Sequence, residues 1–367
     1  VSWVYEYKNS IINFNISLQF MRINMKSIFT WDSYSDQPHI ITDKKFKKSQ
    51  KKKFFLEYLK MLFVFMIVFP ISFVWQFFMR YPKVQMQLGI GVNLDKGNIQ
   101  YDLVKELGVK ELLIRMPLWD MARVDEYVDF AKGFGDDKNI MINILQDREH
   151  VENLELLRTD IKIIFEKFQS LSSEYQIGST TNRTKWGFFA VSEYLNFYQA
   201  VQRVRDGHFP TLKLIGPSVI DFEYYYTASS LFNLKKIKFD KLSSLLYVDR
   251  RGAPDKRQYG FNFKNKINLL ASMVCLSPKA DNDIYITEAN WPLENTAPYA
   301  PTSEKECVSE SDYSQHMQDY IKIAKDTNKV GKLYWHQLVA PGYGLIDNRD
   351  GIVRKTPAFY QFKQLVN

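Results

Sequence analysis

The stretch Ile284-Tyr285-Ile286-Thr287-Glu288 is a short apolar run that ends on a carboxylate, and Trp291 follows three residues later. β-Branched and aromatic residues in such a run are typical of a buried strand. In an α/β barrel the residues that follow a strand lie at the mouth, where reactive groups gather. Glu288 is therefore a candidate catalytic carboxylate. The alternative is a strand-end glutamate that only caps a loop.

Similar apolar runs alternate with helical patterns from residue 84 to residue 367. The predicted strands are Gln87–Val92, Glu111–Arg115, Ile140–Leu145, Tyr175–Gly178, Leu212–Gly216, Leu242–Val248, Ile284–Glu288 and Lys332–His336. Helices are expected at 101–107, 124–132, 154–169, 193–205, 264–273 and 313–325. Eight such βα units predict a closed (β/α)8 TIM barrel, with an open doubly wound sheet as the alternative. Gly89-Ile90-Gly91 lacks the third glycine of a dinucleotide-binding loop, which disfavours the open sheet.

A different pattern precedes the barrel. Residues 44–53 hold seven lysines and no acid, and residues 61–79 hold no charged side chain. The uncharged stretch is long enough to cross a hydrocarbon core of about 30 Å, and the lysine excess before it predicts an extracytoplasmic barrel. Pro70 weakens the span, so an interfacial helix is the alternative. We expect an irregular segment without chemistry (1–43), a lysine-rich run with a membrane helix (44–83), and the barrel (84–367).

The charge balance argues against a nucleic-acid partner. The net charge is +8, but without the lysine run the chain has 42 basic and 41 acidic residues. No basic stripe then remains to follow a phosphate backbone. Metal-ligand spacing among the histidines, Walker motifs and Gly-x-Ser-x-Gly are all missing, so we expect neither a metal nor a cofactor. Cys275 and Cys307 could form a disulfide if the barrel is extracytoplasmic.

The segment from about residue 84 to 367 resembles the clan A glycoside hydrolases, TIM barrels that include families 5 and 39. The resemblance rests on Leu113-Ile114-Arg115-Met116-Pro117, on Ile286-Thr287-Glu288-Ala289-Asn290-Trp291, and on Tyr334-Trp335. It implies that Glu288 is the nucleophile, that Arg115 hydrogen-bonds it and keeps it ionised, and that Trp335 stacks on a sugar. Tyr247 stands where such enzymes often have the tyrosine of a His-x-Tyr pair, although Leu245 occupies the histidine position.

The fourth strand departs from the clan. Its end usually reads Gly-Asn-Glu-Pro-Asn, with the glutamate as general acid/base, whereas this chain reads Ile177-Gly178-Ser179-Thr180-Thr181-Asn182. A threonine hydroxyl cannot protonate a leaving glycosidic oxygen as a carboxylic acid does. Retaining hydrolysis needs two carboxylates about 5–5.5 Å apart, so Thr180 leaves the usual pair incomplete.

Three interpretations stay open. Another acid near the mouth could replace the missing glutamate, the candidates being Asp147, Glu149, Glu193, Asp221 and Glu223. Glu288 could instead act with an activated leaving group or an acceptor sugar, which gives transglycosylation. Alternatively, the barrel binds a glycan without cutting it. We expect a protein that acts on a cell-surface polysaccharide or glycolipid, the alternative being an inactive sugar-binding barrel or a membrane-tethered scaffold in polysaccharide assembly.

Polar and aromatic residues at the predicted strand ends are expected to bind sugar, because aromatic faces stack on C–H groups while amides and charged groups bind hydroxyls. The predicted sugar-binding residues are Asn93, Trp119, Asp147, Asn182, Arg183, Trp186, Asn290, Trp291, Trp335 and His336. Arg183 and Lys185 could bind an anionic sugar, or Arg183 could pair with a neighbouring acid. The loop 291–312 is expected to wall the cleft.

Overall fold

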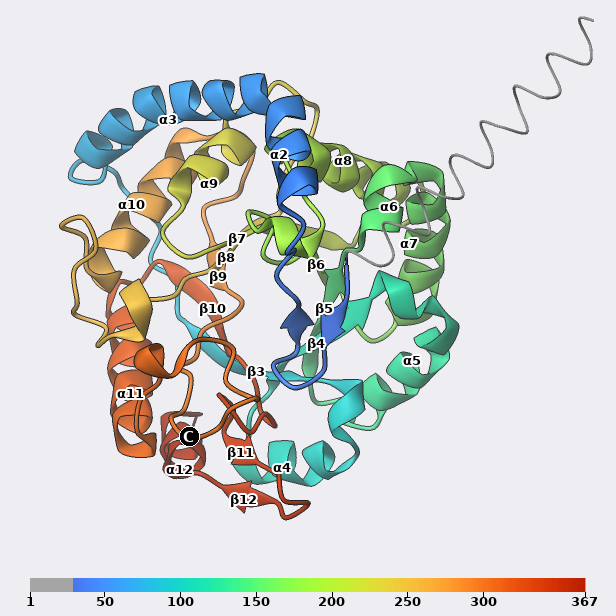
Figure 1. Ribbon diagram of the computed structural model, residues 1–367, viewed down its shortest axis with the longest axis vertical. Coiled ribbons are helices and arrows are strands. Elements are labelled where there is room, and N and C mark those ends of the chain that lie inside the picture. The colour runs from blue at the N-terminus through green and yellow to red at the C-terminus, as the bar shows by residue number, and fades with distance from the viewer. Residues whose placement is uncertain (1–28, 367) are drawn as a thin grey trace, which may run out of the picture.

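The computed structural model describes residues 29–366, and at its centre lies a closed barrel of eight parallel strands (Figure 1). The strands are β3 (Gln87–Val92), β4 (Glu111–Pro117), β5 (Asn139–Leu145), β6 (Glu174–Ile177), β7 (Lys213–Ile220), β8 (Lys241–Leu245), β9 (Ile284–Ile286) and β10 (Val330–Trp335). They follow one another around the barrel, and β10 pairs with both β9 and β3. The predicted TIM barrel is confirmed. Glu288 lies two residues beyond β9 rather than inside it.

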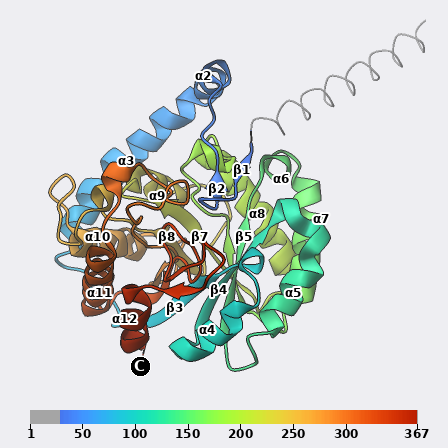
Figure 2. The ribbon, with the colours of Figure 1, turned by 60° about the horizontal axis from the view of Figure 1, so that its bottom comes forward.

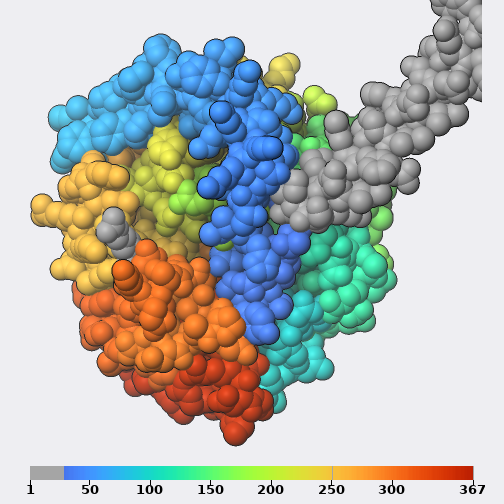
Figure 3. Space-filling view, viewed as in Figure 1, coloured from blue at the N-terminus to red at the C-terminus, as the bar shows by residue number. Residues whose placement is uncertain are grey.

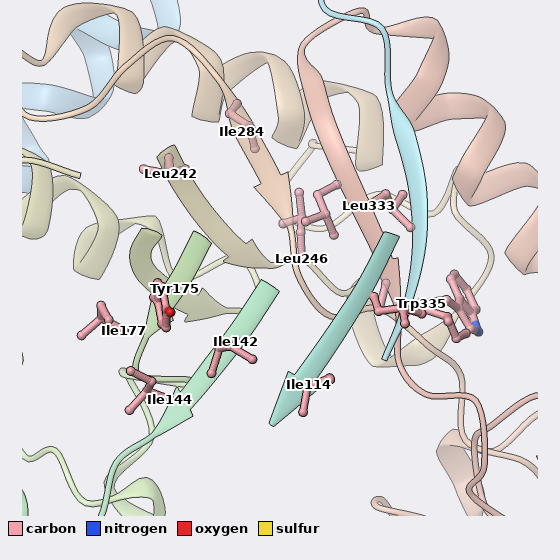
Figure 4. Close-up of a cluster of buried hydrophobic side chains, with 14 of the residues drawn as sticks. Ile114, Ile142, Ile144, Tyr175, Ile177, Leu242, Leu246, Ile284, Leu333 and Trp335 are labelled. Carbon is pink, nitrogen blue, oxygen red and sulfur yellow. The ribbon is translucent and has the colours of Figure 1, made fainter. Parts of the chain in front are cut away.

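The strands separate two apolar clusters, because successive side chains point to opposite faces. One cluster inside the barrel is built from alternate residues of five strands, namely Leu113, Met141, Ile215, Tyr285 and Tyr334. The outward-facing neighbours on the strands belong to a larger core shared with the helices, among them Ile114, Ile142, Ile284 and Leu333 (Figure 4). Burial on both faces explains why these strands appear in the sequence as continuous apolar runs.

The barrel is surrounded by helices. Those at the predicted positions are α4 (Ile99–Leu107), α5 (Val124–Lys132), α7 (Leu154–Phe168), α8 (Val191–His208), α10 (Phe263–Leu276) and α11 (Glu310–Asp326). Three further helices were not predicted: α6 (Arg148–Glu152), α9 (Tyr224–Leu231) and α12 (Pro357–Val366). A short antiparallel pair, β11 (Ile346–Asp347) with β12 (Arg354–Lys355), precedes α12.

Two helices before the barrel carry the lysine run and the apolar stretch. α2 (Lys44–Lys53) begins at Asp43, whose side chain caps it, and has no buried residue. α3 (Phe55–Trp75) begins six residues before the start of the predicted span 61–79 and ends four residues before the end of that span. It packs along α9 and α10 on the outside of the barrel (Figure 1). Val68 and Ser72 are buried there, and Ser272 Oγ donates a 2.7 Å hydrogen bond to the Ser72 carbonyl.

The opposite side of α3 is apolar and exposed. Its large exposed side chains include Leu56, Leu59, Phe63, Met66, Ile67 and Ile71. By length and composition this helix could cross a membrane, and only 17% of its most apolar window is buried. An exposed surface of this kind marks a site of protein or membrane contact.

Residues 29–43, which we call the N-terminal strap, lie across the mouth of the barrel (Figures 2 and 3). Within the strap, β1 (Trp31–Asp32) pairs with β2 (Gln37–Pro38) in a hairpin. Gln37 Nε2 donates a hydrogen bond of 3.1 Å to the Pro301 carbonyl, so the strap contacts the loop after β9. This part of the predicted irregular segment is therefore ordered, and residues 1–28 lie outside the described residues.

Candidate active site

Glu288 lies beyond β9, and two side chains from other strands bind its carboxylate. Tyr247, two residues beyond β8, donates a 2.6 Å hydrogen bond to Oε1. Arg115 on β4 donates from Nη2 to Oε2 at 3.2 Å. His336 follows β10, with Nε2 3.1 Å from Arg115 Nη2 and 3.9 Å from Glu288 Oε2. The structure thus brings together four residues singled out from the sequence.

This arrangement keeps Glu288 ionised. Burial alone would raise its pKa, but the charges of His336 when protonated and of Arg115, with the Tyr247 hydrogen bond, hold the pKa below the usual carboxyl value. Burial lowers the pKa of His336 to about 4, so its imidazole is neutral near pH 7. Arg115 and Tyr247 are therefore the groups that hold the Glu288 charge at that pH. An ionised, oriented carboxylate is what a glycosidase nucleophile requires.

The strap brings a second carboxylate, Asp36, into the same site. Its Oδ2 accepts hydrogen bonds from Gln337 Nε2 at 2.8 Å and Asn93 Nδ2 at 3.3 Å, and lies 3.4 Å from Lys96 Nζ. The Asp36 carbonyl accepts from Arg115 Nη1 at 3.2 Å. Burial opposes ionisation, yet Lys96, Arg115 and Gln337 lower the pKa of Asp36. Asp36 is therefore a fixed anion rather than a proton donor at neutral pH.

A cavity of about 190 Å³ opens above Glu288. It lies between the strap and the ends of the strands. Its lining consists of Ser35, Asp36, Gln37, Arg115, Thr180, Arg183, Lys185, Trp186, Ile220, Asp221, Tyr247, Arg251, Glu288, Asn290, Pro301, Thr302, His336 and Tyr343. Pro301 and Thr302 belong to the loop expected to wall the cleft. The volume is below the roughly 300–1,000 Å³ of sites for drug-sized ligands, so it suits about one sugar ring.

Thr180 lines this cavity just after β6, where the clan has its acid/base. Its φ of +51° is in the left-handed region, and its Oγ1 lies 3.5 Å from Ser179 Oγ. The structure thus places the Thr180 side chain at the cavity, and the incomplete carboxylate pair stays a prediction from the sequence.

The alternative acids differ in position. Asp147 caps α6 and lies 2.8 Å from His150 Nδ1, Glu193 pairs with Arg148 at 2.8 Å, and Glu149 is exposed on α6. None of these three lines the cavity within the described residues.

Asp221 and Glu223, the acids after β7, are joined through Arg183. Arg183 Nη2 donates to Asp221 Oδ2 at 2.6 Å and Arg183 Nη1 pairs with Glu223. Asn182 Nδ2 also donates to Glu223 at 2.7 Å. Of these acids only Asp221 reaches the cavity. Arg183 is therefore paired with neighbouring acids, as one of the two sequence interpretations expected.

The four predicted tryptophans are divided between the cavity and the core. Trp186 lines the cavity, and Trp119 is exposed outside it. Trp31 of the strap packs against both, with ring centroids 5.1 Å from Trp119 and 5.8 Å from Trp186. Trp291 and Trp335 are fully buried and stacked on each other, 5.9 Å apart, and neither lines the cavity. A sugar in this cavity would therefore meet Trp186 rather than Trp335.

The predicted polar residues are divided in the same way. Asn290 lines the cavity and donates to the His336 carbonyl at 2.8 Å. Asn93 holds Asp36 from behind, and Asn182 binds Glu223 and the backbone of Ile220. Asn93 and Asn182 thus support the site without lining it.

Several cavity residues were not predicted to take part. Asp36 and Gln37 come from a strap with no motif and no period, so nothing in the sequence links them to the barrel. Arg251 lies in the loop after β8, and Tyr343 lies in the loop after β10. Their place in loops that follow barrel strands was the signal in the sequence that could have identified them. Within residues 29–366, no three His, Cys, Asp or Glu side chains cluster closely enough to hold a metal. Cys275 and Cys307 are both free.

The closed eight-stranded parallel barrel places the protein in the class of TIM-barrel folds, with an ionised glutamate beside an arginine and a tyrosine at its mouth. Solved structures with this fold include the family 1 β-glucosidase of Thermotoga maritima (TM-score 0.54, 11% identity, 78% of this chain and 98% of that chain). A family 39 β-xylosidase of Caulobacter crescentus has a TM-score of 0.57 at 13% identity, covering 78% of this chain and 72% of that chain.

A family 30 xylanase of Clostridium acetobutylicum is similar too (TM-score 0.50, 12% identity, 78% and 72% coverage). No family model and no curated protein sequence matches the chain. The protein therefore has the fold of the clan A glycoside hydrolases, as the sequence resemblance predicted.

Proposed function

We propose that the protein is a glycosidase-like enzyme that acts on a cell-surface polysaccharide or glycolipid, with Glu288 as its nucleophile. The observation that carries this proposal is the Glu288 carboxylate, bound by Arg115 and Tyr247 at the base of a sugar-sized cavity. The cavity volume favours a single terminal sugar over an internal segment of a polymer. We propose that Trp186 and Asn290, which line the cavity, contact that sugar.

In the proposed reaction Glu288 Oε attacks the anomeric carbon while the bond to the leaving oxygen breaks. Arg115 and Tyr247 orient the carboxylate. Water then attacks the anomeric carbon of the glycosyl ester and releases Glu288, giving the free sugar. Transfer to the hydroxyl of an acceptor sugar in place of water gives transglycosylation.

The proton for the leaving oxygen cannot come from Thr180. Asp221 is the candidate, since it lines the cavity with Glu288 and the other acids weighed above do not. Arg183 binds one of its oxygens, so proton delivery from Asp221 is expected to be inefficient. Leaving groups that need no protonation should therefore react fastest.

Leaving-group dependence tests the proposal. Purified protein is assayed with 2,4-dinitrophenyl and methyl glycosides of common sugars. We expect turnover of a dinitrophenyl glycoside, a loss of about 10³-fold in Glu288→Gln, and a much slower methyl glycoside. Asp221→Asn should lower the rate about 10²-fold only for the methyl glycoside, as loss of a general acid does. Unchanged turnover in Glu288→Gln would remove this residue from the mechanism.

Binding without turnover is the second candidate, and two observations favour it. Thr180 replaces the acid, and Arg183 binds Asp221 at 2.6 Å. In that case wild-type protein and Glu288→Gln bind the same glycoside with equal affinity, and neither releases dinitrophenol. A membrane-tethered scaffold would bind no glycoside at all.

We also propose that residues 61–79 anchor the protein to a membrane, with the barrel on the extracytoplasmic side. The exposed apolar face of α3 supports the anchoring, and the lysines of α2 support the orientation only for a helix that crosses the bilayer. Because the other face of α3 packs on α9 and α10, an in-plane position of this helix needs no change in the fold. A helix that crosses the bilayer would have to leave the barrel.

A further inference from the structure

The charged groups of the cavity are unequally paired. Its three carboxylates all have a cationic partner: Glu288 binds Arg115, Asp36 lies 3.4 Å from Lys96 Nζ, and Asp221 binds Arg183. Two of its cations, Lys185 and Arg251, have no comparable partner. A cavity whose anions are satisfied and whose cations are not is prepared for an anion from outside.

Lys185 stands on the turn Thr184–Trp186 after β6. Its only hydrogen bond in the described part of the chain goes to a neutral acceptor, Gln37 Oε1, at 2.6 Å, and it forms no salt bridge there. Burial and the repulsion of Arg183 lower the pKa of Lys185 to about 8, although Glu288 and Asp32 attract its charge. A partly buried ammonium without a carboxylate carries an uncompensated desolvation cost, which a bound anion removes.

Arg251 stands on the turn after β8, and its side chain is 14% exposed. The guanidinium stacks on the Tyr247 ring, 3.5 Å from the ring centroid, and its closest carboxylate oxygen is that of Asp221, 3.6 Å away. Within residues 29–366 its side chain donates no hydrogen bond, and Nε is buried without an acceptor. Arginine is well suited to bind a carboxylate or a sulfate through two parallel hydrogen bonds.

We propose that the sugar bound in this cavity carries an anionic group, a carboxylate as in a uronic acid or a sulfate ester, and that Lys185 and Arg251 bind it. This inference rests on the proposed sugar-binding function and names its substrate class. It reassigns the anion from Arg183, which Asp221 and Glu223 already occupy, to Lys185 with Arg251.

The groups around Lys185 set the pH dependence of this binding. Arg183 comes from the same loop, Asp32 and Gln37 from the strap, and Glu288 from beyond β9. Bound anion stabilises the ammonium, so anion affinity should be constant below pH 8 and fall as Lys185 loses its proton above it.

The test measures binding in Glu288→Gln, which prevents turnover, by calorimetry at pH 7. The probes are 4-nitrophenyl glucoside and galactoside, the matching glucuronide and galacturonide, and the 6-sulfates of the two neutral sugars, each as both anomers. We expect at least one anionic member to bind 10-fold or more tightly than its neutral counterpart. Lys185→Met should reduce this preference about 10-fold, whereas Lys185→Arg should keep most of it. Adding Arg251→Met to Lys185→Met should lower the affinity for the anionic glycosides further.

Lys162→Met is the matched control, because it removes the same charge from the surface of α7, outside the cavity. In this control the preference for anionic over neutral glycosides should equal that of the Glu288→Gln protein. The unfolding temperature of each variant shows whether it is folded. Equal affinity for charged and neutral members, binding of no member, or an unchanged preference in Lys185→Met overturns the inference. Anion binding without turnover in the wild type would instead reject the hydrolase and keep the anion site, so the two failures are distinguishable.

Discussion

At the scale of single residues, Glu288 depends on Tyr247 for its charge as well as its position. The 2.6 Å hydrogen bond from Tyr247 favours the carboxylate over the acid, and hydrogen bonds to charged groups contribute about 1.5–3 kcal/mol. Tyr247→Phe should therefore raise the pKa of Glu288.

The measurement is kcat/KM against pH with a dinitrophenyl glycoside. The acidic limb of the profile should move to higher pH, so the loss of rate should be greatest on that limb. Tyr259→Phe is the control, since Tyr259 is exposed and forms no contact with Glu288 among the described residues. A profile that does not move would show that Arg115 alone sets the charge.

The residues of the site were only partly predictable, for a physical reason. Glu288, Arg115 and His336 follow strand patterns, and strand ends converge wherever a barrel closes. Asp36 precedes the barrel and has no pattern that links it to Arg115, because that contact depends on how the strap folds back. The resemblance to the clan assigned the Trp335 side chain to the sugar, yet this last residue of β10 faces the core beside Trp291. The position of a residue in the sequence predicts that it lies at a strand end. It does not predict whether the side chain points into the cavity or into the core.

At the scale of elements, buried strands were easier to predict than short helices. Most of the strands are buried on both faces and rich in apolar residues, so their runs stand out against the loops. α9 reads Tyr-Tyr-Tyr-Thr-Ala-Ser-Ser-Leu, with aromatic, β-branched and small polar residues that favour no helix, and its packing against β7 and α3 decides the outcome. α3 was predicted from its apolar composition. Its packing along α9 and α10 could not be predicted, because a helix that is apolar on all sides shows no periodic pattern that marks the buried face.

The strap should stabilise the mouth of the barrel through Asp36. Asp36→Ala leaves Arg115 and Lys96 without this anion inside the fold, and removing one partner of a buried pair costs about 3–5 kcal/mol. Urea unfolding measures the loss. Asp32→Ala on the same hairpin removes an acceptor of hydrogen bonds from Ser35 Oγ and Tyr34 N, so about 1 kcal/mol is expected. Equal costs for the two variants would contradict a central role for Asp36.

The two faces of α3 should respond differently to polar substitution. Phe63, Ile67 and Ile71 are exposed, so replacing all three by serine should change stability by less than about 1 kcal/mol but abolish binding to vesicles. Val68→Asn on the buried face should lower stability by about 1–3 kcal/mol and leave binding intact.

Flotation with phosphatidylcholine vesicles containing 30% phosphatidylglycerol measures membrane binding, and urea unfolding measures stability. Added salt should weaken binding through the α2 lysines, each contributing about 1 kcal/mol near an anionic surface. A triple-serine variant that floats as well as the wild type would mean that α3 is not the anchor.

At the scale of the whole molecule, the mouth of the barrel brings the N-terminal strap together with the residues that follow the last strands. Burial of the His336 imidazole at this mouth makes global stability depend on pH. His336 is held neutral, with a pKa of about 4 against 6.5 in an unfolded chain. Between these values the unfolded chain binds a proton that the folded one does not, so this contribution to stability is complete above pH 6.5 and is lost as pH falls toward 4. The difference corresponds to roughly 3 kcal/mol at most.

His336→Gln removes this term, so its loss of stability between pH 7 and pH 4.5 should be smaller than that of the wild type by about 2 kcal/mol in urea unfolding. His150 acts in the opposite sense, because Asp147 and Asp160 outweigh its burial and raise its pKa, so its stabilisation is lost as pH rises. Both proteins contain His150, and its effect cancels in the comparison. His208→Gln, at an exposed position, should behave as the wild type. If His336→Gln and the wild type lose stability in parallel, His336 is not the group whose burial limits the fold in acid.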